Sequence, residues 1–586
     1  MSEGLSRTLV HEKLHQLGSL VQVKSSSGSA VRDVYEMDPT PLGEGRYSRV
    51  YGVTHRKNGA RRAMKTAKKE SHSQFVSLGA ECPGRLAHHE ANILRHLDHP
   101  NIVRVFEAYE EDDAVHLVLE LCDGGDVLER ILNTNKRMPE AENAALFTQM
   151  LFAIWHVHTQ GMVHRDLKPE HFMFTKREPD RDPLAPHVAA MKLIDFGLSH
   201  WKGTSFAPEG GTPLFMPHEA KVGRPSPEYA DRADMWALGV TLHTMLVGHY
   251  PSKNLTDAAQ AQYFAKPAWS GISRVAVDLL GQLLRQGPAD RPTAAAALRH
   301  PWCADSVSGR CAPPEQLLRK VSQSARAYAM MSDLRKIALM AVAREADASE
   351  ASTVRRLLQT LTVKCNGTLT LEALREAKCE GALGEAVNAL SRDYAEFAGN
   401  HGAIAWTTLL ASVLEPPGAK PDAAGHFEGA EHGGNMIPKI HEAPCWRAFD
   451  FLSNGTDAVS ADSLGQLLAT TESGDPLFSE THEYEQAAGK DTEPRLRQGP
   501  DGNPAVVKPS GGDTADELKK LVSSVIRKGK VDRQEFVYLL RGELRLRSQS
   551  SRATARGTSF SRRLLMLLQC GRKSGSAHHS MSGDFV

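Results

Sequence analysis

The chain has 586 residues, more than one hydrophobic core usually supports, which predicts roughly three or four folded units. Its 70 Lys and Arg residues balance its 70 Asp and Glu residues, so the composition gives no reason to expect nucleic acid as a partner. The eight cysteines form no CxxC pair, which argues against structural zinc and a disulfide framework and favours a reducing location. No run approaches the roughly 20 apolar residues of a membrane-spanning helix, so we expect a cytoplasmic protein.

Composition along the chain divides it into segments. Residues 1–34 include a Ser/Gly-rich stretch with little to bury, which predicts a flexible extension before order begins near Tyr35. β-rich runs and helical periodicity follow as far as Trp302, and the pattern beyond is helical almost throughout. Residues 415–435 and 471–513 are polar and rich in Gly and Pro, so we expect surface linkers or inserted loops there.

Five residues early in the folded part have the spacing of a phosphate-binding device. Gly43 and Gly45 supply two of the three glycines that let a backbone approach phosphates closely, and Ser48 takes the third place. Lys65 follows on a short apolar strand and Glu90 on a predicted helix, which suits a Lys that holds phosphates and a Glu that orients it. Taken alone, a plain glycine turn and a solvated Lys explain these residues equally well.

Two segments further on decide the class of protein. Residues 164–171 read HRDLKPEH, and residues 191–197 read MKLIDFG. They resemble the catalytic loop, H-R-D-L-K-P-E-N, and the metal-binding motif, D-F-G, of the protein kinases. The resemblance continues in chain order through Gly211-Thr212, Glu219, Asp234–Gly239 and Arg291. It implies an α+β, bilobal protein kinase fold over residues 35–302, with Glu219 and Arg291 as a buried ion pair.

The resemblance implies roles for single residues. Asp166 would orient the substrate hydroxyl and accept its proton, Lys168 would steady the γ-phosphate of ATP, and Asp195 would hold Mg²⁺ against the phosphates. Lys65 and Glu90 become a candidate ion pair of the catalytic machinery. The implied nucleotide-binding residues all precede the catalytic loop, and they are Leu42, Gly43, Gly45, Val50, Ala63, Lys65, Glu120 and Cys122.

Two departures from the family pattern bear on activity. His171 stands where the family has an Asn whose side-chain oxygen helps to bind a second Mg²⁺ ion. Because Mg²⁺ prefers oxygen and neutral imidazole suits softer metals, the exchange should weaken one metal site or shift its preference towards Mn²⁺. Residues 216–219 read MPHE where the family usually has A-P-E, which leaves the substrate preference open. We therefore carry two hypotheses, an active kinase and an ATP-binding pseudokinase scaffold.

Three residues bear on the protein substrate. Asp126 and Glu170 match positions at which kinases of the calmodulin-kinase type place acids to bind an Arg three residues before the target hydroxyl. An Arg-directed site is one interpretation of Asp126, and a helix N-cap is the other, because an apolar helical run follows it. Lys168, two residues after the catalytic Asp, follows the Ser/Thr pattern of the family rather than the tyrosine pattern.

The C-terminal half resembles the regulatory part of the calcium-dependent protein kinases. Residues 334–343, LRKIALMAVA, are similar to the junction helix of that family, although any amphipathic helix would show the same apolar stripe. Four eroded helix-loop-helix segments follow in order, which implies an all-α EF-hand-like module. A calcium-binding loop of this type requires oxygen ligands at positions 1, 3, 5 and 9, Gly at position 6 and a bidentate Glu at position 12.

The first two loops lack these ligands. Around Gly367, the first loop has Lys364 at a ligand position and Ala373 at the twelfth. Around Gly402, the second loop begins with Phe397 and continues without the required oxygen ligands. We expect neither loop to bind Ca²⁺.

The last two loops keep only fragments of the pattern. The third, around Gly455, has Asp450 first but Ala461 twelfth. The fourth, residues 524–535, keeps its final Glu but has Lys528 at a ligand position. Tight Ca²⁺ binding is therefore doubtful, and calcium buffering is disfavoured as a function. We expect this half to contact the kinase lobe or a partner helix constitutively.

The end of the chain is basic and rich in Ser. Ser550 and Ser559 each follow an Arg by three residues, which allows autophosphorylation, and residues 562–568 could form a helix at a membrane surface or on a partner. A solvated basic tail is the alternative. The expected segments are a flexible extension (1–34), the kinase domain (35–302), a junction helix region (303–345), a degenerate EF-hand-like module (346–545) and a basic tail (546–586).

Overall fold

The computed structural model divides the chain into two units, residues 1–544 and 545–586, and all described residues lie in the first. The described ranges are 21–25, 30–45, 48–69, 83–134, 138–176, 189–203, 210–222, 227–252, 256–308, 313, 315–346, 351–364, 369–398, 404–414, 442–453, 456–460, 463–464 and 530–541. Ser550, Ser559, the basic tail, the predicted linkers 415–435 and 471–513 and the central glycines of the four loops lie outside them.

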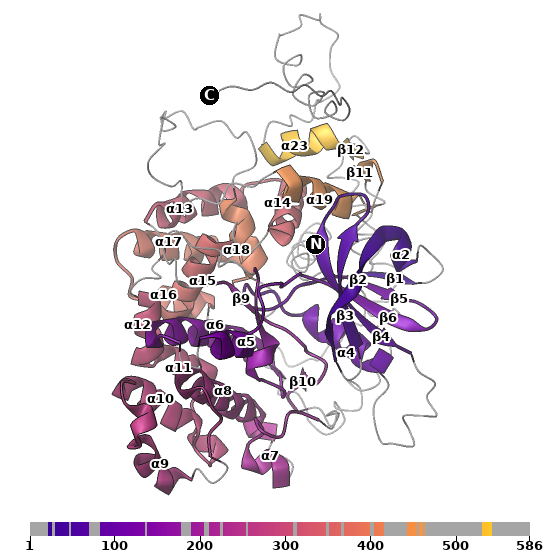
Figure 1. Ribbon diagram of the computed structural model, residues 1–586. Coiled ribbons are helices and arrows are strands. Elements are labelled where there is room, and N and C mark those ends of the chain that lie inside the picture. Colours follow the sequence, from indigo (N-terminus) through magenta and orange to yellow (C-terminus); the bar gives the residue numbers. More distant parts are fainter. Residues whose placement is uncertain are drawn as a thin grey trace, which may run out of the picture. The chain divides into compact units, whose positions relative to one another are not determined.

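A six-stranded sheet forms the small lobe, with the strand order β1-β5-β6-β4-β3-β2 (Figure 1). Its strands are β1 (Gln22–Ser25), β2 (Tyr35–Glu44), β3 (Ser48–His55), β4 (Arg61–Lys68), β5 (Val105–Glu110) and β6 (Ala114–Leu119). Every residue of β6 is buried, as its apolar sequence AVHLVL predicts for a central strand. Helix α4 (Pro83–Leu94) buries an apolar face that includes Ala87 and Ala91, and it presents Glu90 on its buried side.

The N-terminal segment differs from the sequence prediction. Residues 1–34 were expected to form a flexible extension, but Gln22–Ser25 adds strand β1 parallel to β5 at one edge of the sheet. Val21 and Val31 are 5% and 2% exposed, so two apolar side chains on either side of the polar stretch are buried. The Ser/Gly-rich composition between Val21 and Val31 predicted flexibility and gave no sign that these two side chains would be buried.

The large lobe is helical. Its helices are α5 (Val127–Asn133), α6 (Glu140–Thr159), α7 (His218–Val222), α8 (Ala230–Val247), α9 (Asp257–Phe264), α10 (Arg274–Leu283), α11 (Ala294–Arg299) and α12 (Pro301–Ser308). Two short antiparallel strand pairs, β7 (Met162–Val163) with β10 (His200–Trp201) and β8 (Phe172–Phe174) with β9 (Met191–Leu193), flank the catalytic loop and the metal-binding motif. The expected α+β kinase fold is confirmed.

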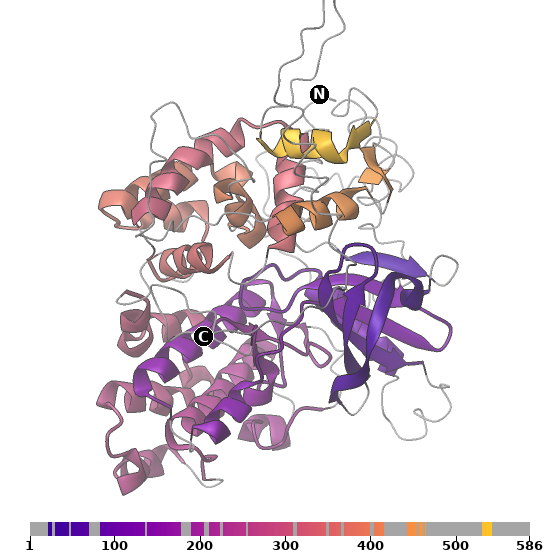
Figure 2. The same cartoon turned by 45° about the horizontal axis from the view of Figure 1, so that its top comes forward.

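The C-terminal half is built on helices, as the sequence predicts (Figure 2). They are α13 (Glu315–Ala329), α14 (Asp333–Glu345), α15 (Ser352–Lys364), α16 (Leu371–Glu376), α17 (Gly381–Arg392), α18 (Trp406–Val413), α19 (Glu442–Leu452) and α23 (Arg533–Arg541). The predicted junction helix is α14. It packs against α18, α19 and α23, and its residues from Ile337 to Ala343 are all buried. Helix α14 is therefore the core of the module.

A short antiparallel strand pair, β11 (Ala458–Ser460) with β12 (Lys530–Asp532), joins the third and fourth loops. Its register places Val459 opposite Val531. Glu535, the final residue of the fourth loop, lies four residues after Val531, and the equivalent residue after Val459 is Ser463. Ser463, and not Ala461, therefore takes the final ligand position of the third loop. The prediction of Ala461 counted twelve positions around Gly455, and the loop is longer than that count.

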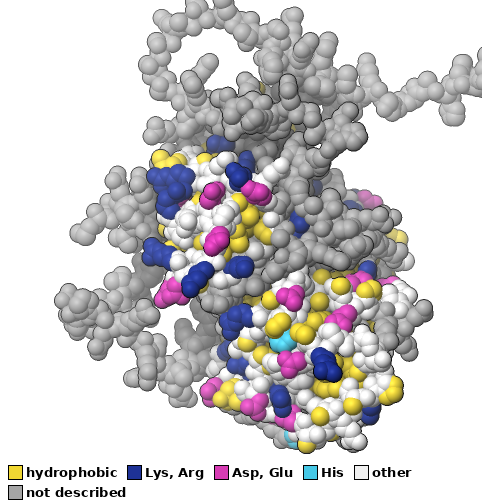
Figure 3. All heavy atoms as spheres, turned by 90° about the vertical axis from the view of Figure 1, so that its left-hand side faces the viewer, with side chains coloured by type: hydrophobic (Ala, Val, Ile, Leu, Met, Phe, Trp, Pro, Cys, Tyr) yellow, Lys and Arg dark blue, Asp and Glu magenta, His cyan; other side chains and the backbone are white. Residues whose placement is uncertain are grey.

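Figure 3 shows the face that carries the helices on the left of Figure 1. In the coloured part of that face, Lys and Arg side chains alternate with Asp and Glu, and hydrophobic side chains lie between them. Charges of both signs are thus interspersed on it, in keeping with the equal totals in the composition. Among the described helices, none combines the length and the apolar content that a bilayer crossing demands.

The ion pair between Glu219 and Arg291 stabilises the large lobe. The Arg291 side chain is fully buried, and its guanidinium binds both carboxylate oxygens of Glu219, at 2.5 and 3.0 Å. Removing one partner of such a pair leaves an uncompensated buried charge. We predict that Glu219→Ala lowers the free energy of unfolding by about 3 kcal/mol in chemical denaturation. Glu315→Ala, which breaks an exposed pair with Arg319, is the control and should leave the transition unchanged.

Candidate active site

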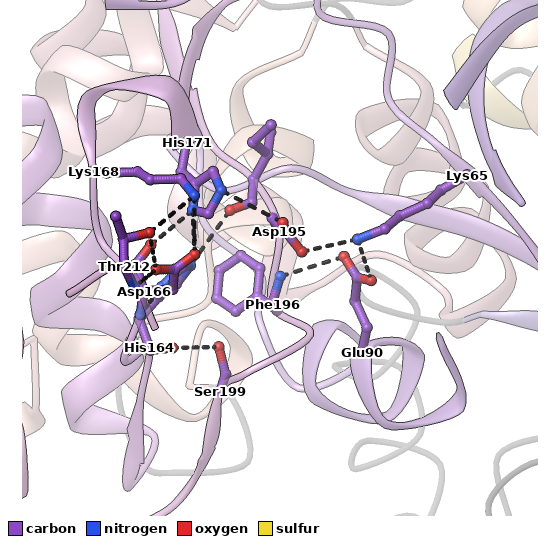
Figure 4. Close-up of polar contacts among 11 residues, drawn as sticks. Lys65, Glu90, His164, Asp166, Lys168, His171, Asp195, Phe196, Ser199 and Thr212 are labelled. Atoms are coloured by element: carbon purple, nitrogen blue, oxygen red, sulfur yellow. Dashed lines mark hydrogen bonds and ion pairs between the residues drawn. The ribbon is translucent and has the colours of Figure 1, made fainter. Parts of the chain in front are cut away.

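Lys65 contacts two acidic residues that come from different parts of the chain, Glu90 and Asp195. From β4 its ammonium contacts Glu90 Oε2 on α4 at 2.6 Å and Asp195 Oδ1 at 2.9 Å. Figure 4 shows the carboxylates of Glu90 and Asp195 both directed toward the Lys65 amine. The Lys65 and Glu90 side chains are 15% and 3% exposed, so their contact is formed away from bulk water, whereas the Asp195 side chain is 42% exposed. The predicted ion pair is thus present, and it extends to the metal-binding motif.

The protonation states follow from these contacts. Burial opposes the charge on Lys65, but Asp195 and Glu90 together raise its pKa above the usual value. Lys65 lowers the pKa of Asp195 well below its usual range, and this attraction outweighs the effect of burial. Burial raises the pKa of Glu90, although Lys65 counteracts this. The ammonium of Lys65 therefore stays charged, and Asp195 stays ionised and able to bind a cation.

The backbone at Arg165 and Asp195 has positive φ angles of 70° and 62°, a conformation that non-glycine residues adopt at a cost of about 1–3 kcal/mol each. Asp234, which is buried on α8, holds the first of these turns. Its carboxylate accepts hydrogen bonds from the backbone N–H groups of His164 (2.9 Å) and Arg165 (2.8 Å) and contacts His158 Nε2 at 2.9 Å. Sequence reasoning used Asp234 only as a family match and missed this role, and the one available signal was an Asp directly before the apolar part of α8.

Asp166 lies beside Lys168, a second residue with a predicted catalytic role. Its carboxylate accepts hydrogen bonds from the backbone N–H and the hydroxyl of Thr212, both at 2.8 Å, and lies 3.2 Å from Lys168 Nζ. Burial raises its pKa, but His171, Lys168 and the Thr212 hydrogen bonds outweigh burial and lower it. Asp166 is therefore ionised, and Thr212 fixes its orientation. Sequence reasoning used Thr212 as a motif match and missed this contact.

His171 lies between the two acidic residues of the site. Its Nδ1 is 2.7 Å from the backbone carbonyl oxygen of Asp166, and its Nε2 is 3.5 Å from Asp195 Oδ2. Burial lowers the pKa of His171, so the neutral imidazole is favoured. A divalent ion at this position would meet one carboxylate oxygen and one ring nitrogen. The residues thus fit a metal ion, with one nitrogen in a place where Mg²⁺ prefers oxygen.

The Phe196 ring places the metal-binding motif. It is fully buried and packs edge-on against the His164 ring, with the ring centroids 4.9 Å apart. Its backbone N–H donates to Glu90 Oε1 at 3.3 Å. Glu90 therefore contacts both Lys65 and Phe196, the residue after Asp195 in the metal-binding motif. Helix α4, which carries Glu90, thus connects the small lobe with this motif (Figure 4).

The predicted nucleotide-binding residues lie on one surface of the small lobe and on the segment between the lobes. Val50 pairs with Lys65, and Ala63 with Leu119, in adjacent strands of the sheet. Leu42 is exposed by 53% at the end of β2, where it can cover a ligand. The glycines Gly43 and Gly45 follow in the same turn, where Gly45 N–H donates to Ser48 C=O at 2.8 Å.

The segment between the lobes holds the other two predicted nucleotide-binding residues. The Glu120 carboxylate contacts Lys192 Nζ at 2.8 Å, and its side chain is directed to this partner. Burial raises the pKa of the Cys122 thiol, which is therefore protonated. A ligand would meet the backbone of this segment, because both side chains are engaged or buried.

The two acids considered for substrate binding differ. Asp126 caps α5: its carboxylate accepts from the Glu129 N–H at 2.8 Å, as the N-cap interpretation predicts. Glu170 lies in the 3₁₀ turn Pro169–His171 at the end of the catalytic loop, and its Oε2 is buried without a hydrogen-bond partner in the described part of the chain. Glu170 therefore retains an acceptor for a basic group, whereas one Asp126 oxygen is already engaged.

The fold and the site together define a protein kinase domain, and residues 37–303 match the family model described as protein kinase domain. The chain is 30% identical over 363 residues to calcium-dependent protein kinase 7 of Arabidopsis thaliana, covering 60% of this chain and 64% of that protein. It is 32% identical over 363 residues to calcium-dependent protein kinase 8 of Oryza sativa subsp. japonica, covering 60% and 63%. CDPK-related kinase 5 of Arabidopsis thaliana is 34% identical over 298 residues, 49% of this chain and 47% of that protein.

The resemblance to calcium-dependent protein kinases is thus confirmed. The chain spans less than two thirds of the length of these relatives. Their names describe them as calcium-dependent or CDPK-related, and for this chain those properties are considered below as proposals.

Thr212 provides a test of the site geometry. We predict that Thr212→Val lowers the rate of phosphate transfer about 10- to 100-fold, because a hydrogen bond to a charged group contributes about 1.5–3 kcal/mol. Nucleotide affinity, measured by calorimetric titration, should stay unchanged because Thr212 contacts Asp166 and not the small lobe. Thr212→Ser keeps the hydroxyl and should retain most of the rate. Equal losses in both variants would show that the hydroxyl has no part in positioning Asp166.

Proposed function

We propose that this protein is a Ser/Thr protein kinase that transfers the γ-phosphoryl group of ATP to protein hydroxyls. The observation that carries this proposal is the simultaneous contact of Lys65 with Glu90 and Asp195. A chain kept only as a scaffold has no chemical need for a buried cation between two carboxylates beside an ionised Asp166. The geometry supports a site that is assembled for transfer.

The transfer step follows from the residues present. Asp166 accepts the proton of the substrate hydroxyl as the hydroxyl oxygen forms a bond to the γ-phosphorus. The bond from that phosphorus to the oxygen bridging to the β-phosphate breaks, and ADP leaves with the bonding electron pair. Lys65 holds the phosphates that remain on ADP, and Lys168 compensates charge on the group in transfer. A metal ion bound at Asp195 would neutralise phosphate charge.

A basic residue before the target hydroxyl is the specificity we propose. Glu170 carries a buried carboxylate oxygen without a hydrogen-bond partner in the described chain, and burial together with Glu170 raises the pKa of Tyr250 nearby. A substrate Arg would form a charge-assisted hydrogen bond with the Glu170 carboxylate. The engagement of Asp126 as a helix cap makes Glu170 the better supported of the two acids.

We also propose that the C-terminal half stays docked on the kinase domain. Asp98, which follows α4, accepts hydrogen bonds from the N–H (2.9 Å) and the hydroxyl (2.7 Å) of Thr407 in the first turn of α18. A carboxylate at a helix N-terminus satisfies free N–H groups and interacts favourably with the helix dipole. The kinase domain therefore supplies the cap of a helix in the C-terminal half.

A second contact lies at the end of α14. The Glu345 carboxylate, 5% exposed, pairs with Arg62 of β4 at 2.5 Å and with Arg447 of α19 at 3.2 Å. The Arg344 guanidinium lies over the rings of Phe106 in β5 and Phe451, at 4.9 and 4.1 Å from their centroids. These charges are buried with partners on both sides of the interface, so separation would leave them unpaired.

Calcium is not required for this arrangement, in our proposal. Asp450, the first ligand position of the third loop, is paired with Arg533 of α23 at 2.8 Å. The same guanidinium lies over the rings of Trp446 and Phe449. Ser463 takes the place of the bidentate Glu in that loop. A side-chain cation thus occupies the carboxylate that would bind Ca²⁺, which supports the loss of tight calcium binding.

The second candidate function is an ATP-binding pseudokinase scaffold, and His171 is the observation that favours it. The test is phosphate transfer to an Arg-x-x-Ser peptide, with Mg²⁺ or Mn²⁺, in the wild type and in Asp166→Asn. We predict transfer that depends on Asp166, because its ionised carboxylate beside Lys168 is the proposed base. Nucleotide binding without transfer in either metal would establish the scaffold instead.

The same assay tests the calcium prediction. We expect equal transfer rates in a calcium chelator and at Ca²⁺ concentrations up to the millimolar range, because Arg533 already neutralises Asp450. Steep activation at micromolar Ca²⁺ would contradict this.

Arg533→Met tests the role of the charge on Arg533, since it keeps the bulk over Trp446 and removes the charge. This variant should weaken the module in thermal unfolding.

A further inference from the structure

In the described part of the chain, Lys192 is a buried cation with a single acidic partner. It lies on β9, and its side chain is 8% exposed. Its ammonium contacts Glu120 Oε2 at 2.8 Å, and Glu120 is the first residue after β6, where the segment between the lobes begins. An ammonium removed from water needs such a counter-charge, because an unpaired buried charge is strongly unfavourable. The ion pair is therefore a fixed connection between β9 and the segment between the lobes.

Backbone hydrogen bonds from a third segment hold the same two elements. The Glu120 N–H donates to the Arg104 carbonyl oxygen at 2.8 Å. In the same short loop, Val103 N–H donates to Leu193 C=O at 3.0 Å, and Leu193 N–H donates to Asn101 C=O at 2.8 Å. This loop is thus bonded both to β9 and to the segment between the lobes, and the ion pair adds a side-chain contact to the same framework.

The neighbours of Lys192 supply no second negative charge. Burial, the stacked ring of His156 and the charge of Lys192 all lower the pKa of His99. Burial and Glu120 raise the pKa of the Cys122 thiol, although Lys192 counteracts this. The imidazole and the thiol are therefore both neutral. Lys192 thus depends on Glu120 for the compensation of its charge.

The two members of this ion pair belong to different parts of the candidate site. Lys192 lies three residues before Asp195, the residue proposed to bind a metal ion beside the phosphates. Glu120 begins the segment whose backbone a nucleotide would meet, because the side chains of Glu120 and Cys122 are engaged or buried. The pair therefore connects the segment that would bind the base with the strand that leads to the phosphate end of the site.

We propose that Lys192 is a positioning residue for the nucleotide base, which acts through Glu120 by holding the segment between the lobes in one place relative to β9. The inference rests on the proposed kinase function, since the base is that of ATP. Without the charge on Lys192, Glu120 loses its partner, and the backbone groups that would bind the base lose their fixed position. The consequence is weaker binding of the base rather than slower transfer of the phosphoryl group.

Adenosine binding to the full-length protein tests the proposal without any phosphate transfer. In calorimetric titration we expect Lys192→Met to weaken the affinity for adenosine about tenfold, as the loss of a charged hydrogen-bond partner typically does. Lys192→Arg keeps the charge and should retain most of the affinity. Lys69→Met, which breaks the ion pair of Lys69 with Glu110 at 2.6 Å, is the matched control and should bind adenosine as the wild type does. Unchanged affinity in Lys192→Met, or an equal loss in Lys69→Met, would overturn the proposal.

A double-variant comparison tests whether Lys192 acts through Glu120. Glu120→Gln keeps the shape of the side chain, removes its charge and should weaken adenosine binding about as much as Lys192→Met. The variant that carries both substitutions should lose no more affinity than either one alone, because both remove the same interaction. Additive losses would show that the two residues act separately and would overturn the proposal.

Steady-state transfer to the Arg-x-x-Ser peptide separates positioning of the base from a general structural role. Lys192→Met should raise the KM for ATP about tenfold and change kcat by less than about threefold, because the groups that contact the reacting atoms are untouched. A fall in kcat with an unchanged KM would contradict the proposal.

The positioning role and the kinase function fail separately. Weaker adenosine binding in Lys192→Met, together with a wild type that transfers no phosphate, would contradict the kinase function alone. Transfer by the wild type, together with unchanged adenosine affinity in Lys192→Met, would contradict the positioning role alone.

Discussion

The structure depends on a buried amine held between two carboxylates. Lys65 connects β4 with Glu90 on α4 and with Asp195 on the loop after β9, so three elements distant in sequence share one charge cluster. Burying such charges is unfavourable unless each has its partner, and loss of any member leaves the others uncompensated. The cluster therefore favours one arrangement of helix, sheet and metal-binding loop. That arrangement also places the strained backbone at Asp195 where its carboxylate can serve a metal ion.

The C-terminal half reaches the same elements from another direction. Asp98 follows α4 and caps α18, and Arg62 belongs to β4, the strand that carries Lys65. Docking thus constrains both the helix that presents Glu90 and the strand that presents the amine. Arg533 pairs with Asp450 at the first ligand position of the third loop. Under our proposal that tight calcium binding has been lost, the helices would still bury their apolar faces and the module would serve as a permanent support.

Much of the fold and of the candidate site could be predicted from the sequence. The position of Lys65 followed from its spacing after the glycines, and the roles of Asp166 and Asp195 followed from the resemblance of their motifs to those of the protein kinases. The junction helix followed from its resemblance to that of the calcium-dependent protein kinases. The strand β1 was not predicted, because its partner β5 lies about 80 residues away in the chain and local composition is silent on such pairing. The end of the third loop was misplaced because the strand register, and not a count from a glycine, decides which residues are equivalent.

Other features needed coordinates because they arise only from tertiary contacts. Thr212 and Asp234 position the catalytic loop from segments well downstream of it, and Glu345 acquires its arginine partners from two different domains. No periodicity marks such residues. Sequence reasoning identified which side chains can perform chemistry, whereas the structure identified which side chains hold them in place.

In our proposal, the C-terminal half holds α4 in its assembled position without calcium. Amide hydrogen exchange of residues 83–94 in the full-length protein measures this most directly, once in a calcium chelator and once in millimolar Ca²⁺. We expect the same slow exchange in both conditions, because the contacts of Asp98 and Glu345 involve no metal ion. Fast exchange in the chelator that becomes slow when Ca²⁺ is added would contradict it.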